Sequence, residues 1–391
     1  MKVSIVELGT VRPGETEVDG LADAVVTARH ADALGFHRVW FAEHHLASSN
    51  ASHHPELLIA AAGAVTRGIR VGSGSVLLNH YSPFKVAEMF QQLEAMYPGR
   101  VDLGMGRATS GQVIDLALQP DRASRPVDDH RERVSEVLAW LYERFPDGHP
   151  FAGHPLMPSV PHVPQTWPLG SSSQGPALAG ELGLGYAFAG FIHPLLATDA
   201  LQEYRRAFRP RGFDAEHPRA MLAVNVAMGE DDADGDRLAL SAKGFYARLM
   251  RGGIGATMPT PEQALRELAP AQRDEPTTIV GDRWPRFVAG GPERVRATLE
   301  QMLEASGADE LMCQNLIAAP EDRRGSHARI AAAFGLEAGR TTRRIGPPGA
   351  ADVDGCLRHL ASELRPSLIR MLCGGRPSAG VACASNRSWR R

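Results

Sequence analysis

The chain has 391 residues, 43% of them hydrophobic, so it can bury a large core as one barrel-sized domain with additions or as two domains. Its formal net charge of −3 argues against a nucleic-acid-binding protein. No apolar stretch reaches about 18 residues and no basic start precedes an apolar run, so we expect neither a membrane span nor a signal peptide. The four cysteines lack CxxC spacing, which favours a cytoplasmic protein without a disulfide framework or zinc site.

Strand and helix patterns alternate from the first residues. An apolar run predicts a strand over Val3–Leu8, and apolar residues at helical spacing predict a helix over Asp19–Leu34 that Gly35 ends. A second strand is predicted over Arg38–His45, and a helix follows over Pro55–Thr66. This alternation is typical of a parallel sheet covered by helices.

The stretch Ile69–Arg107 has the clearest pattern. β-prone apolar residues over Val71–Leu78 predict a third strand, and the apolar spacing over Pro83–Met96 predicts an amphipathic helix with a proline in its first turn. A fourth strand is predicted over Arg100–Gly106. Parallel strands joined through a helix need both faces covered, so the fold class is α/β.

The alternation continues to about residue 335. The later elements are a helix at Asp128–Arg144, a strand at Thr166–Gly170, a helix opened by Ser171 and running to Leu182, a strand at Tyr186–Ala189, a helix at Leu195–Phe208, a strand at Ala220–Ala227, helices at Asp236–Met250 and Pro292–Ser306, and a strand at Glu310–Cys313. Eight strands alternating with helices predict a (β/α)8 TIM barrel with loop insertions. The long connection Gly252–Ala289 is predicted to be a mobile lid hinged at Gly252-Gly253.

The end of the chain differs in composition. Residues 336–391 are rich in arginine and include a Gly-Pro-Pro-Gly segment, and Cys356–Leu372 is predicted as one amphipathic helix broken at Pro366. We therefore divide the chain into a barrel over residues 1–335 and a C-terminal helical extension over residues 336–391. We expect this extension to be a surface or subunit-contact element that takes no part in the chemistry.

Polar residues follow the predicted strands, at the ends where parallel α/β folds carry their sites. They are Glu43, His44 and His45 after the second strand, Gly74, Ser75, Asn79 and Tyr81 around the end of the third, Arg107 after the fourth, and Ser171, Ser172 and Ser173 after the fifth. Serines at a helix start together with a nearby arginine can hold a phosphate. Taken alone, the same residues fit equally well an interpretation in which the serines cap the helix and the arginine pairs with a carboxylate.

Other site chemistries receive less support from the residues. Neighbouring strand residues point to opposite faces, so His44 and His45 do not predict a metal site, and a histidine here can equally be structural. The run from Gly104 to Thr109 lacks the third glycine or alanine of a dinucleotide fingerprint, and no phosphate-binding P-loop or GxSxG motif is present. We therefore expect no metal.

Five separate motifs resemble the bacterial luciferase-like flavin monooxygenases. They are FAEHH at Phe41–His45, VGSGSVLL with SPFKVAE from Val71 to Glu88, EAMYPGRVDLGMGR at Glu94–Arg107, LGSSS with AGELGLGYAFA from Leu169 to Ala189, and GGPERVRATLE with GADELM from Gly290 to Met312. The resemblance covers about Lys2–Gly335 in order. It implies a (β/α)8 barrel, usually a homodimer, that binds FMN at the carboxyl ends of its strands.

The resemblance also implies roles for residues. It places the flavin phosphate at Arg107 and the serine turn, the isoalloxazine ring against Gly74–Ser75, where a non-proline cis peptide is common, and a mouth histidine at His44. We assign cofactor binding to Glu43, Gly74, Ser75, Arg107, Ser171, Ser172 and Ser173, catalysis to His44, and substrate binding to His45, Asn79 and Tyr81. Many relatives have an aromatic residue and alanine after the serine turn; here Gln174-Gly175-Pro176 follows, and the proline removes one N–H donor.

The activity implied by the resemblance is a two-component monooxygenase. Reduced FMN (FMNH2), delivered by a separate NAD(P)H:flavin reductase, would react with O2 to a C4a-peroxide that hydroxylates or epoxidises an organic substrate, for instance in antibiotic biosynthesis. Two alternatives remain open. One is a deazaflavin-dependent hydride-transfer oxidoreductase, which would need a basic groove for the acidic tail of its cofactor. The other is a non-catalytic flavin-binding protein.

Overall fold

The computed structural model describes residues 1–107, 112–118, 129–210, 213, 215–251 and 257–337. All of them belong to one unit that spans Met1–Ile345. The predicted hinge Gly252-Gly253 and the predicted helix Cys356–Leu372 lie outside the described residues. Within the described ranges, no helix is long and apolar enough to cross a membrane.

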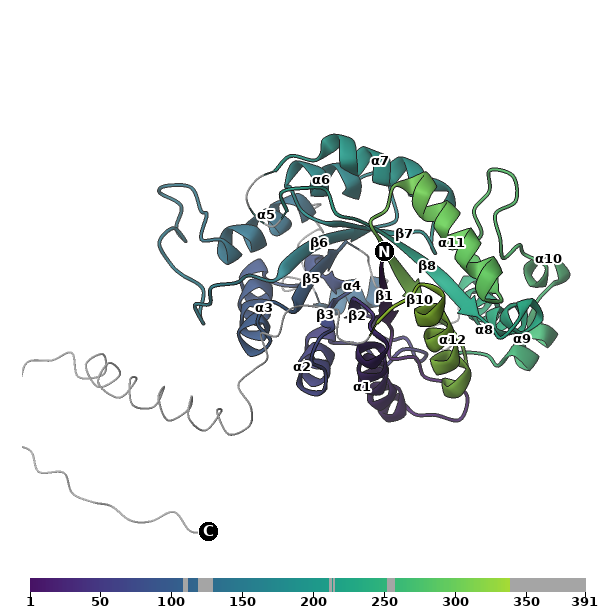
Figure 1. Cartoon of the computed structure of the whole chain (residues 1–391). Helices are drawn as coiled ribbons and strands as arrows, with labels where there is room; N and C mark the ends of the chain where they lie inside the picture. Colours follow the sequence, from purple (N-terminus) through teal and green to yellow (C-terminus); the bar gives the residue numbers. More distant parts are fainter. Residues whose placement is uncertain (108–111, 119–128, 211–212, 214, 252–256, 338–391) are drawn as a thin grey trace, which may run out of the picture. The chain divides into compact units, whose positions relative to one another are not determined.

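Eight parallel strands close into a barrel (Figure 1). Around the ring the order is β10, β1, β2, β3, β5, β6, β7 and β8, and β8 pairs with β10 to close it. The ring strands are β1 (Lys2–Glu7), β2 (Arg38–Phe41), β3 (Arg70–Ser73), β5 (Val101–Gly106), β6 (Gln165–Gly170), β7 (Tyr186–Ala189), β8 (Ala220–Met228) and β10 (Glu310–Gln314). The predicted (β/α)8 TIM barrel is therefore confirmed.

Two short strands supplement the ring. β4 (Val76–Leu77) pairs with the end of β5, and β9 (Phe287–Gly290) pairs with the carboxyl-terminal half of β8. The sequence analysis assigned residues 287–289 to a connection, because a four-residue strand after a long polar segment shows no periodicity. β3 and β4 are separated by Gly74–Ser75, whose peptide bond is cis as expected.

Helices surround the barrel (Figure 1). The helices that follow the first strands are α1 (Glu17–Leu34), α2 (Pro55–Val65), α3 (Pro83–Met96), α4 (Gln112–Leu118) and α5 (His130–Leu141), with the 3-10 turn η1 (Leu78–His80) before α3. The others are α6 (Gly175–Glu181), η2 (Pro194–Leu196), α7 (Ala197–Ala207), α8 (Asp232–Met250), α9 (Pro261–Glu267), α10 (Pro270–Arg273), α11 (Pro292–Ser306) and α12 (Pro320–Ala333).

Local sequence explains where the helices begin and end. The side chain of Thr16 accepts from the backbone N–H of Asp19, whose carboxylate accepts from the backbone N–H of Thr16, and this capping box starts α1. Gly35 ends α1 with a φ of 84°, a left-handed conformation that glycine adopts without steric cost. α3 buries the apolar face that the sequence predicted, including Val86, Phe90 and Leu93.

Paired charges fill the amino-terminal end of the barrel. The Arg38 guanidinium donates to Glu310 Oε1 at 2.7 Å and to Asp102 Oδ2 at 2.7 Å, and Arg70 Nε donates to Asp102 Oδ1 at 2.8 Å. Burial opposes ionisation of Asp102, but the charges of Arg38 and Arg70 lower its pKa to about 2. Two cations balance two carboxylates, so these charges form a paired floor below the site, and removing one partner would leave a buried charge uncompensated.

Two predicted segments differ from the structure. α6 begins at Gly175 and not at Ser171, because Pro176 lacks an N–H and suits the first turn of a helix; the three serines form the bend before it. The connection predicted to be a lid contains α9 and α10, and Lys243 on α8 donates to the carbonyl oxygens of Arg273 and Glu275 at 2.8 and 2.7 Å. Residues 257–275 therefore contain two helices, and the mobility predicted for the connection stays a prediction.

Candidate active site

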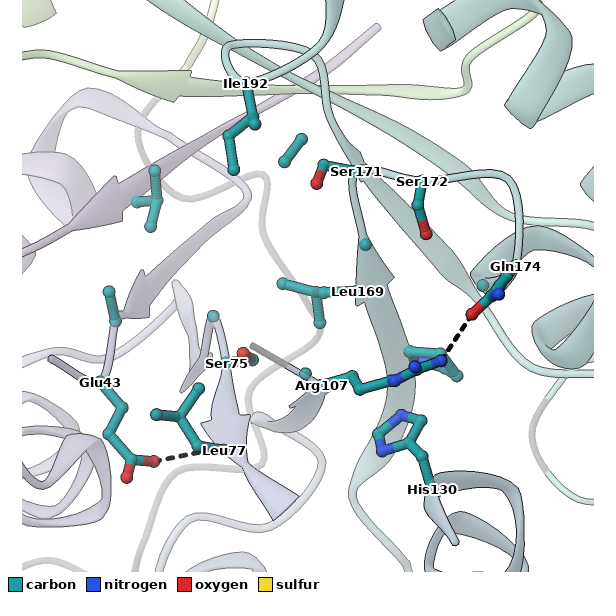
Figure 2. A pocket seen from close by; sticks show the side chains of 18 of the residues that line it. Glu43, Ser75, Leu77, Arg107, His130, Leu169, Ser171, Ser172, Gln174 and Ile192 are labelled. Atoms are coloured by element: carbon teal, nitrogen blue, oxygen red, sulfur yellow. Dashed lines mark hydrogen bonds between the residues drawn. The ribbon is translucent and has the colours of Figure 1, made fainter. Parts of the chain in front are cut away.

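A cavity of about 830 Å³ opens at the carboxyl ends of the barrel strands. Its lining includes Glu43, His44 and His45 after β2, Gly74 and Ser75 between β3 and β4, Arg107 after β5, and Ser171 and Ser172 after β6. Ser173, Asn79 and Tyr81 are not among the lining residues. The structure thus brings eight of the eleven predicted site residues to one cavity (Figure 2).

Glu43 joins the segment after β2 to the segment around β4. Its buried carboxylate accepts from the backbone N–H of Leu77 at 2.8 Å, from Tyr81 Oη at 2.6 Å, and contacts His45 Nε2 at 2.8 Å. Burial and the hydrogen bond to Glu43 raise the pKa of Tyr81. Glu43 therefore fixes the wall beside the Gly74–Ser75 peptide, and Tyr81 contacts this wall residue without lining the cavity.

His44 is held by its backbone while its ring meets the cavity. Its N–H donates to the carbonyl of Ser52 at 2.9 Å, and its own carbonyl contacts His53 Nδ1 at 2.6 Å. The ring Nδ1 is buried and has no hydrogen-bond partner among the described residues. Burial, followed by the nearby His45 and His53, lowers the pKa of His44 to about 4, so the ring is neutral near pH 7.

The positions of His44 and His45 correct one expectation. The sequence analysis placed them on opposite faces of a strand, but β2 ends at Phe41 and both histidines line the cavity. His45 also lies 6.3 Å from His53, with the two rings stacked. Across the described ranges, no group of three or more His, Cys, Asp or Glu side chains is arranged to hold a metal ion.

Arg107 lies at another part of the rim. Its exposed guanidinium donates from Nη1 to Gln174 Oε1 at 2.6 Å, and Ser171 and Ser172 line the cavity in the same region (Figure 2). The backbone places a cation, an amide and two hydroxyls at one end of the cavity, which is a donor set suited to an anionic group. Because the serines precede α6, their hydroxyls and the guanidinium carry this chemistry without a helix terminus.

Glycines on β5 allow β3 and β4 to approach closely. A Cβ at Gly104 would lie 2.1 Å from the carbonyl oxygen of Ser73, and one at Gly106 would lie 2.1 Å from Ser75 Oγ. These glycines therefore have a packing role at the floor of the cavity, which explains why the sequence nearly matches a dinucleotide fingerprint without being one.

Besides Arg131 and Glu132 of α5, the sequence analysis missed three polar lining residues. His130, at the start of α5, contacts Asn79 Oδ1 through Nδ1 at 2.9 Å and lies on the Arg107 side in Figure 2. Gln174 was noted only as a departure from relatives, and Gln314 ends β10. All three lie at strand or helix ends. Gln314 could have been found from the sequence, because it is the polar residue that directly follows the predicted strand Glu310–Cys313.

Comparison with known proteins identifies the family. A family model described as luciferase-like monooxygenase matches residues 1–310. The chain belongs to this family. The luciferase-like monooxygenase of Escherichia coli (strain K12) is 31% identical over 320 residues, which are 80% of this chain and 91% of that protein. The N-acetyl-S-alkylcysteine monooxygenase of Bacillus subtilis (strain 168) is 38% identical over 238 residues, 60% of this chain and 70% of that protein.

Solved structures agree with this assignment. The crystal structure of apo-MsnO8 is 40% identical with a TM-score of 0.78, covering 86% of this chain and 99% of that one. The oxygenating constituent of 3,6-diketocamphane monooxygenase from Pseudomonas putida, solved in complex with FMN, has the same fold. It is 21% identical with a TM-score of 0.62, covering 89% of this chain and 99% of that one. An F420-dependent secondary alcohol dehydrogenase has this fold too, at 19% identity and a TM-score of 0.61, covering 85% of this chain and 98% of that one. Luciferase-like enzymes oxidise small molecules with a flavin or with coenzyme F420.

Proposed function

We propose that this luciferase-like enzyme is a flavin-dependent monooxygenase that uses reduced FMN and O2 to hydroxylate or epoxidise an organic substrate. The observation that carries the proposal is one cavity with anion-binding donors at Arg107, Ser171 and Ser172 and a neutral histidine, His44, with an unpartnered buried Nδ1. A separate NAD(P)H:flavin reductase would supply the reduced flavin.

The residues fit FMN. A cavity of about 830 Å³ is within the usual range for sites that bind cofactors and substrates. Arg107, Ser171 and Ser172 would hold the phosphate, and the Gly74–Ser75 segment, fixed by Glu43, would support the ring system. When bound, reduced FMN supplies the activation of O2, and this chain supplies orientation and exclusion of water.

The charges of the cavity favour FMN over a deazaflavin. Apart from histidines, the cations lining the described part of the cavity are Arg107 and Arg131, and Arg131 Nη2 pairs with Glu181 at 2.5 Å. Glu43 and Glu132 also line the cavity. A long acidic cofactor tail would need a basic groove, whereas one phosphate needs a single cluster such as the one around Arg107.

His44 is proposed to act on protons at the reacting centre. With its pKa lowered to about 4 by burial, the ring stays neutral at pH 7, so it can donate through one nitrogen and accept through the other. Its buried Nδ1 has no hydrogen-bond partner among the described residues. A neutral histidine that hydrogen-bonds the reacting oxygens without adding charge would favour transfer of oxygen to the substrate over release of hydrogen peroxide.

Three further features belong to this proposal. We infer a homodimer in the cytoplasm and a role in antibiotic biosynthesis. The last is expected from the resemblance; a 42% identical segment of 112 residues, 28% of each chain, is shared with the 4-hydroxyprotoasukamycin monooxygenase of Streptomyces nodosus subsp. asukaensis. The homodimer is expected from the resemblance alone, and the role of residues 336–391 as a surface or subunit-contact element remains a prediction.

Stopped-flow spectroscopy tests the proposal. The protein is mixed anaerobically with reduced FMN or reduced F420 and then with oxygenated buffer. We expect reduced FMN to bind and to give a transient absorbance that differs from both reduced and oxidised free FMN. Preference for F420 with no reaction toward O2 would favour the hydride-transfer alternative, and binding of FMN with oxidation at the rate of free flavin would favour the non-catalytic one.

A further inference from the structure

Gln314 lies across the barrel from the proposed phosphate site. It ends β10, and Arg107 follows β5. In the closed ring of eight strands, β5 is the fourth strand from β10 in either direction. Both residues line the same cavity. A flavin phosphate held at Arg107 would therefore leave Gln314 at the opposite side of the cavity.

The side chain of Gln314 is buried, oriented and only partly satisfied. It is 5% exposed, and its Oε1 accepts from Tyr246 Oη at 3.2 Å. Burial raises the pKa of Tyr246 to about 12, so the hydroxyl keeps its proton and acts as the donor. Tyr246, on α8, is itself fixed edge-on against Phe287 at 5.5 Å. Among the described residues the Gln314 amide nitrogen donates to no partner, which leaves its N–H donors for the cavity.

The lining around Gln314 is apolar. The neighbouring strands in the ring contribute Val6 from β1, and the segment after β7 contributes Phe191 and Ile192. The same segment continues to Leu195 in η2, whose side chain is 65% exposed. Ile192 projects into the cavity from the side away from Arg107 (Figure 2). This half of the cavity offers burial to apolar groups, and one amide donor.

The charged lining residues lie elsewhere. Arg107 follows β5, and Arg131 and Glu132 belong to α5. Glu43 follows β2, and its carboxylate already contacts three protein donors. Arg286 lies 5.9 Å from the Tyr246 ring and donates to the carbonyl oxygen of Ile192 at 3.5 Å, but it does not line the cavity. The described lining beside Gln314 therefore offers no charge to a charged substrate group, whose loss of hydration is costly. An uncharged acceptor oxygen would pair with the amide N–H at little cost.

We propose that the half of the cavity around Gln314 binds a largely apolar, uncharged substrate that carries a carbonyl oxygen, and that the Gln314 amide, oriented by Tyr246, donates to this oxygen. The proposal rests on the proposed monooxygenase function, because that function places the flavin at the Arg107 side. Gln314 then sets which end of the substrate enters the barrel, and it is a specificity-determining residue.

A matched pair of ligands tests the proposal without flavin. 1-Tetralone and tetralin have the same bicyclic frame, but only 1-tetralone carries a carbonyl. The affinity for each ligand is measured by ligand-observed NMR in the wild type and in Gln314→Met. This substitution keeps the length of the side chain and removes its donor. We expect the affinity for 1-tetralone to fall about three- to tenfold and that for tetralin to change less than twofold. Tyr246→Phe should weaken 1-tetralone alone, by a smaller factor, and provides a second variant should the first fail to fold.

Gln301→Met is the control, because it makes the same substitution at an exposed position of α11 that does not line the cavity. It should leave both affinities within twofold of wild type. Equal losses for the two ligands in Gln314→Met, or no binding of either ligand to the wild type, would overturn the proposal. A loss of FMN affinity above about threefold in Gln314→Met would also overturn it, because the side chain would then contact the flavin. Failure of the wild type to bind FMN would refute the monooxygenase function alone, since the two ligands are compared without flavin.

Discussion

Removing the guanidinium of Arg107 tests the proposed phosphate site most directly. A charge-assisted hydrogen bond contributes about 1.5–3 kcal/mol, and exposure to solvent places Arg107 at the lower end of that range. The phosphate would also have to replace or share the 2.6 Å bond to Gln174 Oε1, a bond to a neutral acceptor that contributes about 0.5–1.5 kcal/mol. With about 2 kcal/mol for the phosphate contact, the net loss for Arg107→Ala is then about 0.5–1.5 kcal/mol, which weakens FMN binding roughly two- to twelvefold.

Quenching of flavin fluorescence measures this loss for FMN and for riboflavin, which lacks the phosphate. Riboflavin should bind wild type and Arg107→Ala with nearly equal affinity. Arg131→Ala is the matched control, because Arg131 lines the same cavity but already pairs with Glu181; its effect on FMN should stay below twofold. Raising the salt concentration should weaken FMN binding to wild type more than to Arg107→Ala. If both flavins lost affinity equally in Arg107→Ala, the arginine would support the cavity and not the phosphate.

Four further predictions follow from the same structure. His44→Ala should bind FMN within about twofold of wild type, but product formation should fall about 10²–10⁴-fold while hydrogen peroxide accumulates. The measurement is the amount of product per O2 consumed, and a ratio within about threefold of wild type would refute the role. Asp102→Asn should lower the free energy of unfolding in urea by about 3–5 kcal/mol, whereas Glu300→Gln in an exposed pair should cost less than about 1 kcal/mol. Unfolding free energy should fall between pH 6.5 and 4, because the pKa values of His37 and His44 are lowered to about 4 by burial and their unfolded forms take up protons first; a flat profile would contradict this. Truncation after Gly339 should leave FMN affinity within about twofold, and loss of binding in a folded truncation would refute a purely peripheral extension.

Most of the barrel follows from periodicity that the sequence displays. The helices Asp19–Leu34 and Pro292–Ser306 are long, amphipathic and ended by glycine, so α1 and α11 agree with the prediction to within two residues at each end. The four-residue strand β9 has no such period. It pairs with β8, where Asn225 and Phe287 are partners although they lie 62 positions apart, so local patterns cannot reveal the pairing.

The site was predictable at strand ends and less so in its contacts. Glu43 was recognised as a polar residue after a strand, but its three donors come from β4, Tyr81 and His45, which the pairing of β2 with β3 brings together. The assumed strand alternation of His44 and His45 failed because β2 stops at Phe41, where the chain leaves the sheet. Gln314 was passed over because a glutamine at the end of the last strand has no motif; its meaning depends on which strand lies opposite.

The two ends of the barrel divide stability from chemistry. At the amino ends, the buried charges form ion pairs with one another inside the ring. Arg38 pairs with Asp102 and Glu310, and Arg70 pairs with Asp102 and also donates to the carbonyl oxygen of Val101. At the carboxyl ends, His44 Nδ1 is buried without a hydrogen-bond partner among the described residues, and the Gln314 amide nitrogen donates to none of them. Leaving such groups unpaired is destabilising. A molecule bound in the cavity can complete these hydrogen bonds and remove that cost. The unpaired donors and acceptors of the cavity therefore indicate its ligands more directly than its shape does, and the fully paired floor is what lets the barrel tolerate them.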